Sequence, residues 1–260
     1  MKLEFGMMCG EGGRCHNEDI GAIFTPAMLF VAIDGMGGHE GGEIAAAMVY
    51  EGFRALTHQD PGLALLCQTA EAINARMYAM NTESASQDEN QGGRYRGMGA
   101  VVTAIWFDLD SEVYHLHHVG DTRAYEYIDG RLTLVSDDHS LSCVKALSER
   151  ERQKHRLKNI VTSSYGAREG FEHMLATTYR IVEGMTILLC SDGLTDYVDP
   201  DVMEAIIAND MGAQKKAEAL YQSAMDADTC DNVTIIIVHV MPEDRDCKTR
   251  SNSATLCPIE

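Results

Sequence analysis

Four aspartates stand beside glycine or asparagine at the borders of apolar, strand-like segments. One apolar run ends in Asp34 within "LFVAIDGMGG", and another ends in Asp192 within "ILLCSDGL". Asp121 lies in a Gly-Asp turn between two such segments, and Asp231 comes just before a further apolar run. Small neighbours let the backbone approach closely, so the four carboxylates can converge at one edge of a sheet. Without a partner they would repel one another and raise one another's pKa.

A hard divalent cation would offset this repulsion. Mg²⁺ and Mn²⁺ prefer carboxylate, carbonyl and water oxygens as ligands. Arg14 lies near Glu18 and Asp19 in "GGRCHNEDIGAIF", and a guanidinium can bind a phosphate through two parallel hydrogen bonds. Each feature alone has a simpler explanation, because Gly-Asp pairs are common in turns and an arginine beside acids commonly forms a plain ion pair. Together they indicate a divalent-metal site with a phosphate-binding arginine.

Strands and helices must hold these residues in place. Apolar and β-branched runs predict strands at residues 3–8, 20–24, 29–33, 100–108, 112–119, 123–128, 172–182, 185–190 and 233–240. Helical spacing of apolar residues predicts helices at residues 41–56, 62–80, about 140–154, 200–209 and 213–226. The polar stretch 81–97 is expected to form a surface loop. Short turns between the later strands favour antiparallel hairpins, so the grouping of elements predicts an α+β fold.

The histidines and cysteines have structural explanations. Alternation in "YHLHHVG" places His115 and His117 on one face of a strand that we expect to be partly exposed. The eight cysteines are scattered without a Cys-x-x-Cys pair, which argues against a structural zinc site and for reduced thiols. Cys15 and Cys190 adjoin the acidic segments but lack the Cys-x5-Arg spacing of thiol phosphatases, so we interpret both as packing residues.

Charge and hydropathy limit the classes of binding partner and the cellular location. The 260 residues include 21 basic and 40 acidic ones, giving a net charge of −19. That charge opposes binding to nucleic acid or to an anionic membrane unless a strong local basic patch exists. No apolar stretch approaches the length of a membrane span, and the N-terminus lacks the continuous apolar region of a secretory signal. We therefore expect a cytoplasmic protein.

Seven segments, taken in chain order, resemble the metal-dependent protein phosphatases of the 2C type. They are "RCHNED" (14–19), "VAIDGMGGHEGGEIA" (31–45), "GMG" (97–99), "HVGDTRAY" (118–125), "SDDHSL" (136–141), "CSDGLTDYV" (190–198) and "DNVTIIIV" (231–238). The bacterial form of the family is the closer likeness because of its Asp-Gly-Met-Gly-Gly-His motif. The resemblance implies a central antiparallel β-sandwich flanked by helices on both sides, a four-layer αββα fold. Residues 1–240 would form the catalytic domain and residues 241–260 a loose tail.

The resemblance also implies a site with two Mn²⁺ or Mg²⁺ ions. By this likeness Asp34 bridges both ions, and the Gly35 carbonyl binds the second. Asp192 and Asp231 complete the shell of the first ion. Glu18 would lie at the second ion, largely through water, with Asp19 supporting the ligands. Arg14 would bind the substrate phosphate, and Asp121 with Asp192 would hold a third, weaker ion. Asn232 and Asp196 match motif positions near the site.

Three departures from the family pattern affect these expectations. Met36 occupies the place where many relatives have a histidine proposed as general acid, so the proton donor is unassigned. "GMGAV" replaces the usual Gly-Met-Gly-Thr-Thr, which removes two hydroxyls. The segment 142–159, where relatives have a flap, is shorter and rich in lysine and arginine. It is interpreted either as a solvated helix or as a docking surface for acidic or phosphorylated protein segments.

The expected activity is hydrolysis of phosphoserine and phosphothreonine in proteins. A water between two divalent ions is deprotonated near neutral pH and attacks phosphorus, while Asp34, Asp192 and Arg14 form the catalytic centre. The implied partners are phosphorylated proteins and a counterpart Ser/Thr kinase, and we expect a monomer. One alternative is a pseudophosphatase that binds a partner without turnover. Another is a narrow regulator that dephosphorylates a single signalling protein.

Overall fold

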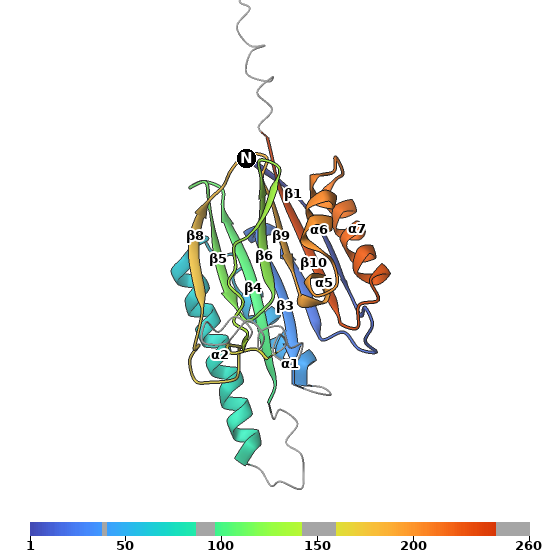
Figure 1. The fold of residues 1–260 in the computed structure, drawn as a ribbon. Coiled ribbons are helices and arrows are strands. Elements are labelled where there is room, and N and C mark those ends of the chain that lie inside the picture. The colour runs from blue at the N-terminus through green and yellow to red at the C-terminus, as the bar shows by residue number, and fades with distance from the viewer. Residues whose placement is uncertain (38–40, 87–96, 142–159, 243–260) are drawn as a thin grey trace, which may run out of the picture.

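The computed structural model describes residues 1–37, 41–86, 97–141 and 160–242. Its ten strands in this part of the chain form two antiparallel sheets (Figure 1). The first sheet has the order β1 (Lys2–Gly10), β10 (Val233–Met241), β9 (Thr186–Cys190), β6 (Arg123–Ile128), β7 (Arg131–Leu134). The second sheet has the order β2 (Asp19–Phe24), β3 (Leu29–Met36), β4 (Gly99–Asp108), β5 (Val113–Val119), β8 (Leu175–Arg180).

The two sheets pack face to face, and residues along β3 show why. Phe30 and Ala32 point into the core between the sheets, whereas Val31 and Ile33 point to the opposite face, where helices cover them. All four are fully buried. A strand that is apolar at every position must be covered on both sides, because its alternate side chains face opposite ways.

Helices form the two outer layers. The helices α1 (Gly41–Arg54) and α2 (Leu63–Ser86) pack on the second sheet, and α6 (Pro200–Ala208) and α7 (Ala213–Asp226) pack on the first together with the short α5 (Asp192–Thr195). Figure 1 shows the two helical layers on opposite sides of the sandwich. Helix α6 starts at Pro200, and the Asp199 side chain caps it by accepting a hydrogen bond from the Asp201 N–H. The predicted four-layer αββα fold is confirmed.

Several boundaries differ from those predicted. Strand β3 continues to Met36, because hydrogen bonds with its neighbours β2 and β4 extend beyond its apolar part. Helix α2 continues to Ser86, so residues 81–86 are helical rather than loop. The strand predicted at 172–182 is shorter, and the strand β7 and the helix α5 were not predicted, because each has only four residues.

The histidines of β5 are buried, so the prediction of a partly exposed strand is wrong. His117 and His118 have no exposed surface, and His115 is 9% exposed. Helix α2 and the loop carrying Tyr165 cover this strand, and the His117 Nε2 lies 2.6 Å from the Tyr165 hydroxyl. Ser140 forms a bridge with Val161 rather than beginning a helix, and the basic segment 142–159 lies outside the described residues. No helix in the described ranges is long and apolar enough to cross a membrane.

Candidate metal centre

The predicted acidic residues meet in one cleft at an end of the sandwich. Its volume is about 430 Å³, and segments far apart in the sequence supply its walls. The lining residues are Arg14, Glu18, Asp34, Gly35, Met36, Gly37, Asp121, Val161, Asp192, Asp231 and Asn232. Asp19 is buried opposite Asp34 in the strand register, and Asp196 is an exposed residue at the end of α5. All the predicted site residues except Asp19 and Asp196 therefore line the cleft.

Asp34 occupies a place that the sequence alone did not predict. It lies inside β3, paired with Asp19 of β2 on one side and with Val101 of β4 on the other, rather than at the end of the strand. The next residue must be glycine, because a Cβ on Gly35 would lie 2.2 Å from the Gly42 carbonyl oxygen and 2.7 Å from that of Glu18. The backbone at Gly35 therefore lies in close contact with the first turn of α1 and with the N-terminal loop at Glu18.

Burial and mutual repulsion raise the pKa values of the carboxyls. Burial is the largest cause of the raised pKa of Asp34, followed by the charges of Asp19, Asp192, Asp121 and Asp231. Burial, with the nearby charge of Asp192, raises the pKa of Asp121 to about 8. Burial likewise raises the pKa of Asp192 to about 6 and that of Asp19 to about 7. At neutral pH the cluster therefore requires protons or a cation, and its oxygen donors fit a hard divalent cation.

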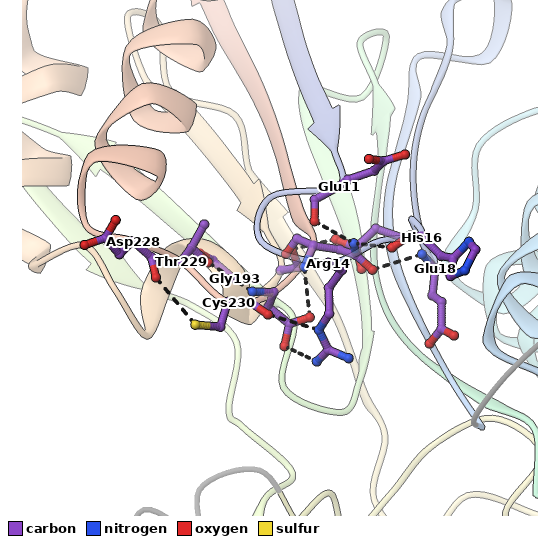
Figure 2. A network of polar contacts seen from close by, with 12 residues as sticks. Glu11, Arg14, His16, Glu18, Gly193, Asp228, Thr229 and Cys230 are labelled. Carbon is purple, nitrogen blue, oxygen red and sulfur yellow. Dashed lines mark hydrogen bonds and ion pairs between the residues drawn. The ribbon is translucent and has the colours of Figure 1, made fainter.

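Arg14 forms an ion pair on the rim of this cleft. Its Nη2 donates to the Asp231 carboxylate over 2.8 Å, and its Nε donates to the Cys230 carbonyl over 3.1 Å, as Figure 2 shows. The side chain of Arg14 remains 54% exposed. The plain ion pair that the sequence left open as an alternative is therefore present, and the guanidinium is still accessible from solvent.

Asn232 holds the N-terminal loop across the site. Its Oδ1 accepts a hydrogen bond from the Glu18 N–H over 2.9 Å, and its Nδ2 donates to the carbonyls of Glu11 and His16. These contacts fix the loop that carries Arg14 and Glu18 (Figure 2). The sequence placed Asn232 only near the site, whereas the structure shows how it orders the loop.

The motif "SDDHSL" braces the turn that carries Asp121. Arg123 donates to the Asp138 carboxylate, with Nε 2.9 Å from Oδ1, and the Gly120 N–H donates to His139 Nδ1 over 3.1 Å. The Ser136 hydroxyl accepts a hydrogen bond from the Ala124 N–H. The sequence pattern alone assigned no role to the residues of this motif. Arg123 stands two residues after Asp121, and the two acids of "SDDHSL" follow within 15 residues, so the sequence held a signal for this half-buried ion pair.

The carboxylates do not form a closed ligand set by themselves. Among the described residues, no group of three or more His, Cys, Asp or Glu side chains is close enough to hold a metal ion. Arg14 already pairs with Asp231, so one of these carboxylates has a cationic partner within the chain. A divalent ion here would need backbone carbonyls and water besides the carboxylates, as Mg²⁺ commonly does.

Comparison with known proteins identifies the family. A sequence model described as protein phosphatase 2C matches residues 16–226. The chain belongs to the protein phosphatase 2C family. The serine/threonine protein phosphatase PstP of Mycobacterium tuberculosis is 32% identical to it over 237 residues, which are 89% of this chain and 43% of that protein. A putative protein phosphatase 2C-type of Streptococcus pyogenes is 31% identical over 245 residues, covering 89% of this chain and 94% of that protein.

Solved structures of the protein phosphatase 2C family agree with the fold. The crystal structure of the Mycobacterium tuberculosis phosphatase PstP/Ppp has a TM-score of 0.79 and 26% identity, covering 92% of this chain and 99% of that one. A second structure, the catalytic domain of PstP in complex with two manganese ions, has a TM-score of 0.77 and 27% identity, covering 92% and 98%. This chain spans less than half the length of the full PstP protein.

Proposed function

We propose that this chain hydrolyses phosphoserine and phosphothreonine in proteins with the help of bound Mn²⁺ or Mg²⁺. The observation that carries the proposal is the cleft where Asp34, Asp192 and Asp231 converge in a member of the protein phosphatase 2C family. Relatives that match most of the chain are named as serine/threonine protein phosphatases, and one was solved with two manganese ions.

The acidic residues divide into the ligands of two ions. Asp34 and the Gly35 carbonyl would hold the ion nearer α1, and Glu18 would support it from the N-terminal loop. Asp192 and Asp231 would hold the other ion together with Asp34. When bound, the divalent ions supply Lewis-acid chemistry that lowers the pKa of water and neutralises charge on the phosphoryl group.

Asp121 would take a third ion together with Asp192. Burial raises the pKa of Asp121 to about 8, so an ion at this site would have to displace a proton near neutral pH, which would lower its apparent affinity.

Arg14 would bind the substrate phosphate. Its guanidinium pairs with Asp231 in this structure, and with a divalent ion held by Asp231 the donors of Arg14 would be available to an incoming phosphate. Met36 lines the cleft and has no proton to donate, so it cannot protonate the leaving alkoxide.

The remaining roles concern residues around the cleft and the whole protein. Asp19 and Asn232 would support the ligands, and Asp196 would lie close to Asp192 without binding a metal. Residues 1–240 would act as one catalytic unit, a cytoplasmic monomer whose substrates are phosphorylated by a counterpart Ser/Thr kinase. Size-exclusion chromatography with light scattering tests the monomer.

The test is hydrolysis of a phosphothreonine peptide by the purified chain. We expect phosphate release with Mn²⁺, none with excess chelator, and a loss of at least about 100-fold for Asp34→Asn, because it removes a ligand shared by two ions. Asp110→Asn, in an exposed turn, is the matched control and should retain full activity. Equal rates with Mn²⁺ and chelator would contradict the metal mechanism. Peptide binding without any turnover would favour the pseudophosphatase.

A further inference from the structure

The hydroxyl of Ser191 takes part in an unusual contact beneath the cleft. Ser191 follows β9 and is the N-cap residue of α5, yet its side chain makes no capping hydrogen bond to that helix. Serine is favoured at this position because its hydroxyl normally accepts from the first N–H groups of the helix. Here the hydroxyl instead donates to Asp19 Oδ2 over 2.8 Å.

The position of this hydroxyl is fixed from two sides. Its oxygen accepts a hydrogen bond from the Thr234 N–H over 2.9 Å, and the Ser191 N–H donates to the Thr234 carbonyl over 3.0 Å. Ser191 is 1% exposed and Thr234 is fully buried. The Asn232 carbonyl oxygen lies 3.5 Å from the same hydroxyl, so Asp19 Oδ2, at 2.8 Å, is the nearer acceptor for the single hydroxyl proton of Ser191.

Asp19 in turn stands directly behind the proposed metal ligands. It is 4% exposed and is paired with Asp34 in the register of β2 and β3. A hydrogen bond from a fixed hydroxyl holds this carboxylate in one orientation beside Asp34. Removing the hydroxyl would leave the Oδ2 oxygen without this donor in a buried setting, so the carboxylate would turn.

We propose that Ser191 is a positioning residue that orients Asp19 and thereby sets the affinity of the Asp34 cluster for divalent cations. This inference rests on the proposed metal-dependent function. Ser191 touches neither substrate nor reacting atoms and acts only through Asp19. Losing a supporting hydrogen-bond partner of a metal site typically weakens metal binding about 10- to 100-fold, and we expect the lower end of that range for Ser191→Ala.

The experiment is calorimetric titration of Mn²⁺ into metal-free wild type, Ser191→Ala and the control Thr186→Val. Thr186 lies at the other end of the same strand, is 2% exposed, and has its hydroxyl 2.9 Å from His239 Nδ1. Thr186→Val therefore also removes a buried hydrogen bond, but one that lies away from Asp19. We expect about tenfold weaker Mn²⁺ binding for Ser191→Ala and unchanged binding for Thr186→Val.

Each result decides between positioning and a merely structural role. Mn²⁺ affinity of Ser191→Ala within about twofold of wild type, or equal weakening in both variants, would overturn the proposal. If Ser191→Ala does not fold, Ser191→Cys, which puts a weaker donor in the same place, is titrated instead, and Mn²⁺ affinity within about twofold of wild type would again overturn the proposal. The proposed activity is judged separately on wild type, so an active wild type with unchanged affinity in these variants refutes positioning alone.

Discussion

Replacing Asp192 by asparagine should stabilise the metal-free protein while abolishing its activity. Burial, aided by the charges of Asp231 and Asp196, raises the pKa of Asp192 from its ordinary value of 3.8 to about 6. One pKa unit corresponds to about 1.4 kcal/mol, so keeping Asp192 ionised in the folded metal-free chain costs about 3 kcal/mol at most. The asparagine removes this cost but also a favourable charge in the first turn of α5, worth about 0.5 kcal/mol. We expect a net gain of at most about 2.5 kcal/mol.

The pH dependence gives this prediction its sign. A carboxyl whose pKa is raised on folding contributes stability that is complete below the pKa of the unfolded chain and is lost as the pH rises through the folded value. The advantage of Asp192→Asn should therefore be absent near pH 4, grow between about pH 4 and 6, and stay constant above that range.

Urea unfolding in excess chelator measures the effect. Trp106, the one tryptophan of the chain, is fully buried and reports unfolding by its fluorescence. Asp110→Asn serves as the control for loss of an exposed carboxylate. A lower free energy of unfolding for Asp192→Asn than for wild type at pH 8, or a difference that does not vary with pH, would refute the reasoning. Added Mn²⁺ should stabilise wild type more than the variant, because the variant lacks a ligand.

Three further changes test other parts of the structure. Gly35→Ala should lower the free energy of unfolding by about 1–3 kcal/mol in urea titrations, since its Cβ would meet the backbone of Gly42; an unchanged midpoint would contradict that close contact. Arg14→Lys should lower kcat/KM for a phosphopeptide by about tenfold, because lysine cannot form the paired hydrogen bonds of arginine. Values of kcat and KM equal to those of wild type would show that Arg14 does not bind the phosphate. Burial lowers the pKa of His117 from 6.5 to about 3, so below pH 6.5 the unfolded chain binds a proton that the folded chain does not. The free energy of unfolding should therefore fall on acidification, by about 2 kcal/mol at pH 5. His117→Gln should lack this part of the loss in urea titrations at pH 7 and pH 5, and the same loss in both proteins would show that His117 does not cause it.

The sequence predicted the chemistry of the site better than its geometry. Asp34, Asp121, Asp192 and Asp231 were recognisable because glycine or asparagine beside an aspartate at the border of an apolar run is a local pattern. The end of β3 was placed too early, because Asp34 and Gly35 interrupt its apolar run before Met36. Hydrogen bonding to β2 and β4, which is not a local property, continues the strand through Asp34 to Met36.

The local signal also pointed the wrong way along β5. The histidines of β5 suggested partial exposure because of their polarity. Helix α2 and Tyr165 cover that strand, and the Tyr165 hydroxyl lies within hydrogen-bond distance of His117.

The resemblance to the protein phosphatase 2C family implied the layered fold, whereas the residues by themselves determined the set of oxygen donors and the strands that are apolar on both faces. These follow from residue type and from the two-residue period of a strand, which short segments contain in full. Only the tertiary structure decided that Asp19 faces Asp34, that Arg14 pairs with Asp231, and that Ser191 serves Asp19 rather than its own helix. Strand register and the meeting of distant loops depend on contacts between segments, and no local pattern specifies the partner.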